Sequence, residues 1–389
     1  MVTILDRSVM INYSDNIGDR FEICPHRSRA MHADNSIRAA TSSAPLLGFW
    51  YPALLAADVR PGTMKPLVLL GQPILICRNQ DSGLAALRDI CPHRAMPLSL
   101  GHFDGQRVEC SYHGWQFDME GRCRHIPALV SGSPIVPDKI SVASYRCAER
   151  DGYIWIYFPD TDAPAAPPEV PQLPVLSDKY RLFHISAQLD CTIDDGIVGL
   201  MDPAHGPFVH TSAWWRTRGS IHEKAKEFEP IPSGFRMKAH APSSNSGLYK
   251  VLGLSGHPIT TTIDFILPNI RLELVQAGPR WFSSRATVTP LTDTQCRIDF
   301  CAAWNCFRWV PFSKTIFRMI ARTFLNQDRD VMQRQAQGLR YKPPMMLLDD
   351  ADTPAKWYYK LKAAHLAARA NGGILLHPLK ESVTLRWRS

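Results

Sequence analysis

The sequence predicts an α+β protein in which an all-β unit precedes a larger α+β unit. The chain has 389 residues, which corresponds to two or three domains. Its first half contains short β-rich runs separated by turn residues, and its second half contains long helical patterns between further strand-like runs. The composition, 45% hydrophobic and 21% charged, is that of a globular protein and excludes a disordered or fibrous one.

The first two segments differ in their pattern of polar and apolar residues. Residues 1–45 are polar and show no sustained period, so we expect an N-terminal extension there. Residues 46–158 form the predicted all-β domain, because short β-rich runs alternate with Gly- and Asp-containing turns. The predicted strands are Pro66–Leu70, Pro73–Arg78, Leu84–Asp89, Ile140–Cys147 and Gly152–Phe158.

A proline-rich segment separates the two halves. Six prolines lie between residues 159 and 174, a density typical of a stiff linker, which we place at 159–178. The second domain then runs over 179–389. Its predicted strands lie at 180–188, 248–254, 259–266, 270–276, 284–289 and 295–305, and its predicted helices at 192–205, 314–338 and 354–370.

Charge and hydropathy limit the partners. No apolar run approaches the ~20 residues that span a bilayer, so we expect no membrane partner. Asp6 and Arg7 interrupt the place of a secretory signal, so the expected location is cytoplasmic. The net charge of +8 is spread along the chain without a run of five like charges, which argues against nucleic acid and suits an acidic protein partner.

The first candidate site is a pair of Cys-His motifs. Cys91-Pro92-His93 is followed, after sixteen residues, by Cys110-Ser111-Tyr112-His113. Two sulfur and two nitrogen ligands suit zinc or an iron–sulfur cluster. Zinc fingers usually pair Cys with Cys and His with His, so the interleaved order favours the Rieske arrangement, in which two Cys hold one iron and two His the other.

Other cysteines do not extend this motif. Cys24-Pro25-His26 copies the first motif, but no Cys-x2-His follows it, so we interpret it as structural. Cys296, Cys301 and Cys306 are five apart and alternate between the faces of an extended chain, which predicts core packing.

The second candidate site is Asp202-x2-His205-x4-His210. We expect Asp202 and His205 to share a helix face, and Gly206-Pro207 to break the helix so that His210 swings back beside His205. Two His and one carboxylate are the set that ferrous iron uses in oxygenases, so a third ligand must come from elsewhere.

Together these motifs resemble Rieske non-haem iron oxygenases over roughly residues 47–345. The resemblance rests on Cys91–Gly101, Cys110–Phe117 and Asp202–His210. It implies a Rieske domain followed by a helix-grip catalytic domain. The family's third iron ligand is a late carboxylate on a helix, which we place at Asp328 with Asp330 as the alternative. One departure is that Ile197, Val198 and Gly199 stand where many members carry Asn or Glu-Asn.

The resemblance also implies the cofactors and their ligands. These are a [2Fe–2S] cluster on Cys91, His93, Cys110 and His113, and a mononuclear Fe²⁺ on His205, His210 and Asp328. Asp202 would link the mononuclear iron to a Rieske His of the neighbouring subunit in a homotrimer.

The implied activity uses O2 and NADH. It is the hydroxylation or oxidative demethylation of an aromatic or cyclic compound, and the motifs resemble the vanillate-demethylase and pheophorbide-oxygenase branch, a monooxygenase rather than a dioxygenase. Electrons would come from a separate ferredoxin or flavin reductase, steered by Arg94, Arg107, Arg122 and Arg124. We expect an apolar substrate pocket around Leu200, Phe208 and Trp214. The alternatives are a Rieske electron carrier and a zinc-stabilised nucleic-acid-binding protein.

Overall fold

The structure is a computed structural model of the whole 389-residue chain. It describes residues 46–160, 166–210, 219, 221–242, 256–306, 308, 310–343, 345–373 and 375–389. The expected extension over 1–45 with its Cys24 motif, the strand expected at 248–254, and Trp214 lie outside the described residues.

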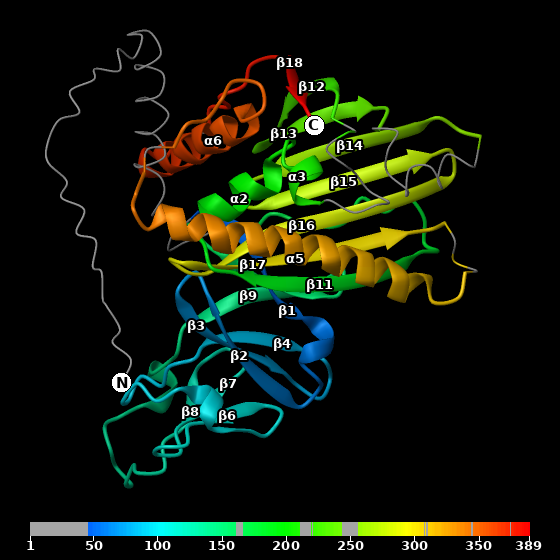
Figure 1. The fold of residues 1–389 in the computed structure, drawn as a ribbon. Coiled ribbons are helices and arrows are strands. Elements are labelled where there is room, and N and C mark those ends of the chain that lie inside the picture. The colour runs from blue at the N-terminus through cyan, green and yellow to red at the C-terminus, as the bar shows by residue number, and fades with distance from the viewer. Residues whose placement is uncertain are drawn as a thin grey trace, which may run out of the picture.

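A six-stranded antiparallel sheet forms the centre of the N-terminal half (Figure 1). Its order is β1-β10-β9-β4-β3-β2. Every side chain of β10, Tyr-Ile-Trp-Ile-Tyr-Phe, is buried. One face of the strand packs in the hydrophobic core of the N-terminal half, and the other face packs against the C-terminal half. The strands are β1 (Phe49–Leu55), β2 (Thr63–Leu69), β3 (Gln72–Arg78), β4 (Leu84–Arg88), β9 (Ser144–Arg150) and β10 (Tyr153–Phe158).

A small four-stranded sheet is inserted between β4 and β9. It lies at the end of the molecule away from the C-terminal half (Figure 1), and it has its own core around Phe117, Leu98 and Val108. The sheet consists of β5 (His102–Phe103), β6 (Arg107–Glu109), β7 (Gln116–Asp118) and β8 (Cys123–His125). Three short 3-10 turns accompany these sheets, η1 (Ala56–Asp58), η2 (Leu98–Leu100) and η3 (Pro137–Lys139).

The C-terminal half is an eight-stranded antiparallel sheet in the order β11-β17-β16-β15-β14-β13-β12-β18. The strands are β11 (Arg181–Leu189), β12 (Glu223–Ile231), β13 (Gly234–His240), β14 (Ile259–Ile266), β15 (Ile270–Ala277), β16 (Arg280–Thr292), β17 (Gln295–Trp304) and β18 (Val383–Arg388).

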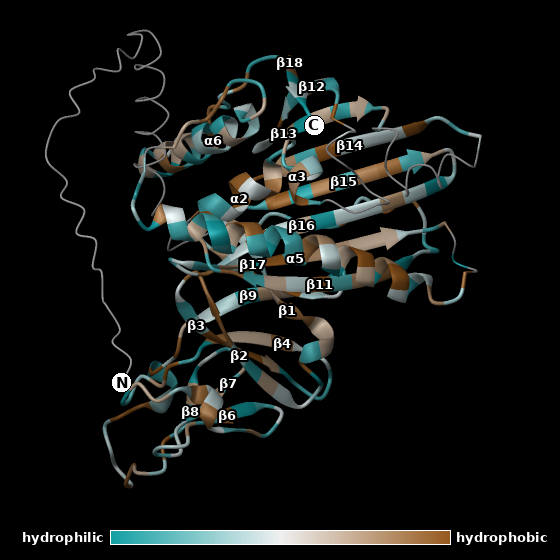
Figure 2. Cartoon of the chain, in the orientation of Figure 1, coloured by the Kyte–Doolittle hydropathy of each residue, from teal (hydrophilic) through white to brown (hydrophobic). Residues whose placement is uncertain are grey.

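The helices of the described residues in this half cover one face of the sheet (Figure 1). They are α2 (Ile193–Met201), α3 (Gly206–Val209), α5 (Ser313–Leu339) and α6 (Thr353–Ala370). Figure 2 shows α5 in alternating hydrophilic and hydrophobic colours, as expected of a helix with one face on a sheet. No helix among the described residues is long and apolar enough to cross a bilayer.

The predicted class, an all-β N-terminal unit and an α+β unit with helices on a sheet, is confirmed. The predicted bounds of five N-terminal strands and of the helices α5 and α6 match the observed bounds to within a few residues. One helix prediction was wrong at its C-terminal end. The expected helix at 192–205 ends at Met201, and Asp202 is extended with φ −63° and ψ 115°.

The cause of this difference is Pro203. A proline disfavours the helical conformation of the residue before it, so the chain turns out of α2 at Asp202. Pro207 then lies in the first turn of α3, where its missing N–H costs nothing. Asp202 and His205 therefore do not share a helix face, and Gly206-Pro207 starts a helix rather than breaking one.

The two halves meet through a buried interface. Asp151, from the turn between β9 and β10, accepts hydrogen bonds from the Leu173 amide and the Arg285 guanidinium, both at 2.8 Å. The Arg285 guanidinium also lies 4.7 Å from the centre of the Trp155 ring. Leu173 is buried, so the described part of the proline-rich segment packs between the halves.

Candidate metal centres

The two Cys-His motifs form two loops of similar shape, one between β4 and η2 and the other between β6 and β7. In each loop the amide four residues after the Cys bonds back to the Cys carbonyl, at 3.0 Å for both Ala95 and Gly114. Both residues have positive φ, 56° and 68°. Glycine adopts this conformation without strain, whereas Ala95 must be held in it by its surroundings. Each loop therefore presents its Cys and His on one tight turn.

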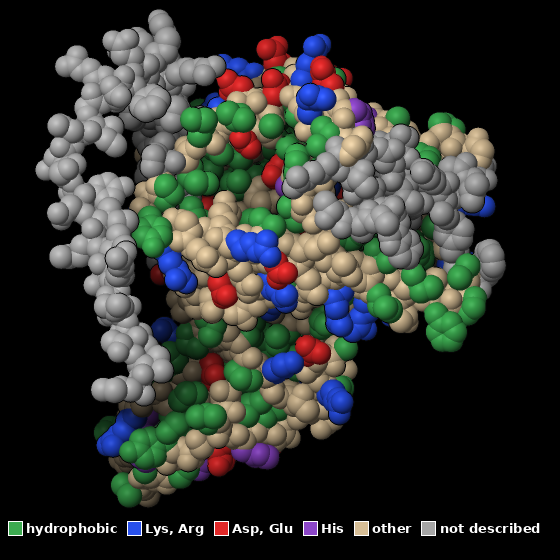
Figure 3. Space-filling model, in the orientation of Figure 1, with side chains coloured by type: hydrophobic (Ala, Val, Ile, Leu, Met, Phe, Trp, Pro, Cys, Tyr) green, Lys and Arg blue, Asp and Glu red, His purple; other side chains and the backbone are tan. Residues whose placement is uncertain are grey.

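The thiols point inward and the imidazoles lie nearer the surface. Cys91 and Cys110 are 1% and 2% exposed, whereas His93 is exposed and His113 is half-buried. The His93 ring stacks on Trp115 with ring centres 4.8 Å apart, and it lies 4.5 Å from the His113 ring. Figure 3 shows histidine side chains at the surface at this lower end of the molecule.

This donor set fits a two-iron cluster better than a single ion. Burial raises the pKa of the Cys91 thiol to about 11, so a metal is needed to hold it as a thiolate here. Desolvation, with the charges of His93 and Arg94, lowers the pKa of His113, which keeps a ring nitrogen free for a metal. Within the described ranges, no three of these four residues bring their ligand atoms within 4.8 Å of one another, as one zinc ion would require.

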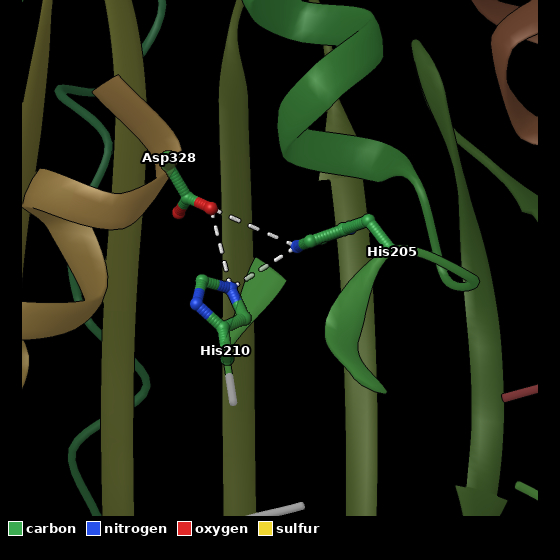
Figure 4. A group of neighbouring side chains, drawn as sticks. All are labelled: His205, His210 and Asp328. Atoms are coloured by element: carbon green, nitrogen blue, oxygen red, sulfur yellow. Dashed lines mark hydrogen bonds and ion pairs between the residues drawn. The ribbon is translucent and has the colours of Figure 1, made fainter. Parts of the chain in front are cut away.

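A second donor set lies between α3 and α5. His205 precedes α3 and His210 follows it, so one helical turn brings their Nε2 atoms to 3.1 Å. Asp328, from the middle of α5, places Oδ1 3.2 Å from the His210 Nε2 and 3.8 Å from the His205 Nε2. Figure 4 shows the three side chains pointing toward one another. They are the one set of three or more such ligands that converges within the described part of the chain.

The outer hydrogen bonds show that this set is built for a cation. The His205 Nδ1–H donates to the Asp202 carbonyl at 2.8 Å, and the His210 Nδ1–H donates to the Gln327 Oε1 at 3.1 Å. Both Nε2 atoms are therefore acceptors that face each other and a carboxylate, with no proton to share. A bound metal ion relieves this repulsion, so the residues present fit a ferrous ion.

The two candidate carboxylates differ clearly. Desolvation raises the pKa of Asp328 to about 6, although the charges of His205 and Arg271 oppose this. Asp330 is exposed and pairs with Arg329 at 3.0 Å. The structure thus brings Asp328, and not Asp330, to the two histidines.

Asp202 lies beside the set but contacts it differently from the expectation. Its carbonyl accepts the His205 hydrogen bond, whereas its carboxylate Oδ2 is 3.7 Å from the same Nδ1 and its Oδ1 accepts from the Ala204 amide at 2.7 Å. The carboxylate also lines a pocket of about 590 Å³ between α2, α5 and the segment before α6. Four methionines contribute to the apolar part of its wall, namely Met201, Met332, Met345 and Met346.

Sequence reasoning missed several contacts at both centres. Trp115 follows the second motif by two residues, and its stacking on His93 depends on a loop conformation that the spacing does not encode. Phe324 packs against His210 from one turn before Asp328, at a ring separation of 4.8 Å. Of the expected pocket residues, Leu200 is half-buried and Phe208 is 54% exposed.

These two centres define the class of protein, an iron enzyme with an electron-storing centre and a separate mononuclear site. Comparison with known proteins agrees. Residues 49–146 match the Rieske [2Fe–2S] domain, and residues 197–368 match the vanillate O-demethylase oxygenase C-terminal domain.

Relatives of known name extend over most of the chain. The oxygenase component of dicamba O-demethylase from Stenotrophomonas maltophilia is 37% identical over 329 residues, which are 78% of this chain and 93% of that protein. The chain therefore belongs to the Rieske non-haem iron oxygenases, which are oxidoreductases with a [2Fe–2S] cluster and a non-haem iron. This membership gives no support to the electron-carrier alternative.

Two further similarities are narrower. Chlorophyllide a oxygenase of Arabidopsis thaliana is 35% identical over 172 residues, 43% of this chain but only 30% of the length of that relative. The crystal structure of dicamba monooxygenase bound to dicamba has the same fold, with a TM-score of 0.65 at 23% identity over 82% of this chain and 98% of the other.

Proposed function

We propose that this protein is an O2-dependent monooxygenase that hydroxylates or oxidatively demethylates an aromatic or cyclic compound. The observation that carries the proposal is the convergence of His205, His210 and Asp328 in a chain that also has the Cys-His loop pair. The match to an O-demethylase over 93% of its length favours demethylation chemistry.

In this proposal Cys91, His93, Cys110 and His113 hold the cluster, and His205, His210 and Asp328 hold the iron. When bound, these groups supply one-electron storage and open coordination positions for O2 chemistry. The Asp202 carbonyl and Gln327 fix the orientation of the two histidine rings, so that both Nε2 atoms aim at one point.

We assign Asp202 as the link between centres of two neighbouring copies. The small sheet with its Cys-His loops and the helices that carry His205, His210 and Asp328 lie in different parts of the molecule, with the six-stranded sheet between them (Figure 1). A neighbouring copy in a homotrimer can instead bring its exposed His93 to the pocket that Asp202 lines. Replacing Asp202 by Asn is expected to leave both metals bound and stop turnover.

Mixed assemblies test the transfer between copies. Cys110→Ala removes a cluster ligand and Asp328→Ala removes an iron ligand, so each variant alone is inactive. Coexpressed, the two are expected to regain a fraction of wild-type turnover, because an intact cluster then neighbours an intact iron site. Inactive mixed assemblies that contain both metals would contradict this arrangement.

The electron donor is proposed to be an acidic ferredoxin or flavin reductase. Arg94 is exposed next to Tyr112 at the tip, whereas Arg124 is already paired with Asp118 and Asp138. Arg94 is therefore better placed than Arg124 to attract an acidic electron donor. The rate at which the donor reduces the cluster should then fall as ionic strength rises. The nine described cysteines form no disulfide with one another, which fits the reducing cytoplasm that we propose as the location.

The experiment that tests the function is anaerobic reconstitution with iron and sulfide, followed by turnover with a generic reductase, NADH and a panel of aromatic methyl ethers. We expect about three irons per chain and O2 consumption coupled to product. Iron content near three without any coupled product across the panel would count against the proposed activity.

A further inference from the structure

A methionine of α5 packs against the backbone of α2 beside the candidate iron ligands. Gly199 lies within α2, and a Cβ added to it would be 3.0 Å from the Met332 Cε and 3.3 Å from the Met332 Sδ. The end of the Met332 side chain therefore occupies the space that a larger residue at position 199 would need. Glycine is unfavourable in the interior of a helix, and this close packing is what its lack of a side chain permits.

Met332 also lies one helical turn from an expected iron ligand, Asp328. Residues four apart on a helix share a face, with their Cβ atoms about 5–6 Å apart. On the other side of the contact, Gly199 is three residues before Asp202, whose carbonyl accepts the hydrogen bond of the His205 ring. The contact between Met332 and Gly199 thus lies between the two segments that bring the histidines and Asp328 to one point.

A small reagent can reach this methionine. Met332 lines the pocket of about 590 Å³ between α2, α5 and the segment before α6, together with Met201, Met345 and Met346. The Met332 side chain is half-buried, and Met346 at the same pocket is 61% exposed. Met332 therefore borders a cavity that is large enough for a peroxide and is not sealed in the core.

The thioether of Met332 is the group that such a reagent would change. Hydrogen peroxide transfers one oxygen atom to a methionine sulfur, so that the thioether becomes a sulfoxide and the peroxide becomes water. The sulfur loses two electrons, and an S–O bond forms as the O–O bond breaks. The sulfoxide is polar, and methionine sulfoxide reductases reverse the step. An oxygen atom on the Met332 sulfur has little room beside α2, because even a Cβ at Gly199 would be in tight contact with that sulfur.

We propose that Met332 is a site of reversible oxidation, and that its sulfoxide separates α2 from α5 and weakens iron binding by His205, His210 and Asp328. The oxidant is hydrogen peroxide. This inference rests on the oxygenase function proposed above, because a site that reduces O2 by two electrons without oxidising a substrate yields hydrogen peroxide next to this pocket. Oxidation of Met332 would thus switch off an enzyme that consumes O2 without forming product.

Iron binding after peroxide treatment tests the proposal without turnover. The full-length protein is treated with millimolar hydrogen peroxide, catalase removes the excess, and dithiothreitol reduces oxidised thiols. The cluster and the iron are then reconstituted anaerobically, and competition with a chelator gives the affinity for the mononuclear iron. Peptide mass spectrometry gives the oxidised fraction of each methionine. We expect wild-type protein with oxidised Met332 to bind this iron about 10-fold more weakly than untreated protein, the loss typical when groups that orient metal ligands are disturbed.

Two variants separate Met332 from the other methionines. Met332→Leu keeps the volume of the side chain but has no sulfur, so its iron affinity should be the same with and without peroxide treatment. Met319→Leu is the matched control on the same helix. Met319 is 65% exposed and belongs to the N-terminal part of α5, away from the pocket, so this variant should lose affinity on treatment as the wild type does.

Three results would overturn the proposal. The first is an equal loss of affinity in treated wild type and treated Met332→Leu. The second is a change of less than about 2-fold in wild type whose Met332 is fully oxidised. The third is a Met332 that stays unoxidised while Met319 is converted completely.

The proposed function fails on different measurements. Untreated protein that holds only about two irons per chain would reject the mononuclear site itself. Protein with about three irons per chain but no coupled product would reject the oxygenase activity, and the effect of Met332 oxidation on iron affinity would stand.

Discussion

The two metal centres of this chain are built in opposite ways. The Cys-His loops come from a single stretch of 23 residues, 91–113, and each is closed by its own backbone hydrogen bond. The triad joins residues more than a hundred positions apart, and its geometry depends on how α5 packs against α2 and α3. The first site is thus encoded locally, whereas the second exists only when the tertiary structure does.

Asp328→Ala should have the largest effect on the iron content of the triad, that is, of the site formed by His205, His210 and Asp328. It removes the carboxylate that reaches both histidines, so we expect loss of the mononuclear iron and of turnover, with the visible spectrum of the cluster unchanged. Metal analysis should then give about two irons per chain.

Asp330→Ala is the matched control, two residues away on α5. Its carboxylate is exposed and pairs with Arg329, so iron content and turnover should remain as in the wild type. If the effects of the two substitutions were reversed, the ligand assignment on α5 would be wrong.

The sequence carried more information about the local site than about the assembled one. The order and spacing of the two Cys-His motifs predicted a metal site and favoured a cluster over zinc, whereas the Gln327-Asp328 segment was chosen by its likeness to the family. The end of α2 before Asp202 was not predicted. The prediction ended the helix at Gly206-Pro207, whereas Pro203 already disfavours the helical conformation at Asp202.

Several strands were not predicted from the sequence, and each omission has a physical reason. Strands β5 to β8 have two or three residues each, too few to show a period. Strand β12 begins Glu-Lys-Ala-Lys-Glu, and much of its outward face is exposed, so polarity concealed it. The sequence also does not show that the ion pair of Arg271 and Glu273 lies on the helix-covered face, since only the register of β14, β15 and β16 shows which face it occupies.

Lys362→Met tests whether the triad depends on helix packing. The Lys362 ammonium lies 2.7 Å from Asp194 at the start of α2, both side chains are 1% exposed, and the Tyr358 hydroxyl also donates to Asp194. Removing the cation leaves a buried carboxylate without its partner, and we expect a loss of ~3–5 kcal/mol in the free energy of unfolding. Thermal melts should show it, with mononuclear iron lost before the cluster.

Two comparisons make this test specific. Lys360→Met removes an exposed cation from the same helix, two residues before Lys362, so the free energy of unfolding should change by less than ~0.5 kcal/mol. The double variant Asp194→Leu with Lys362→Met should recover much of the stability, because no unpaired charge remains. Equal losses for Lys360→Met and Lys362→Met would refute the argument.

Gln327→Leu should weaken the triad by a smaller amount. The side-chain carbonyl of Gln327 holds the His210 ring by its Nδ1–H, and loss of such a partner typically costs ~10–100-fold in metal affinity. Competition with a chelator would measure this for iron. Asn326→Leu, one residue earlier, is expected to leave the affinity unchanged, and a similar drop there would indicate a general effect on α5.

The smallest expected effect lies at the interface between the two regions. The His184 Nε2–H donates to the Asp151 carbonyl at 2.7 Å, and burial lowers the pKa of His184 below its ordinary 6.5. The unfolded chain therefore takes up a proton near pH 6 that the folded protein does not, so the free energy of unfolding should fall as the pH drops through 6.5. Because the ring is only half-buried, solvent screens part of the effect, and its contribution should be the smallest of those predicted.

His184→Gln should remove this part of the pH dependence, since glutamine does not titrate. His365 also has its pKa lowered by burial, so the comparison needs the difference between wild type and variant and not the wild-type slope alone. Urea unfolding at pH 7.5 and 5.5 would measure it. An unchanged difference between the two pH values in the variant would mean that His184 does not couple the pH to the packing of the two halves.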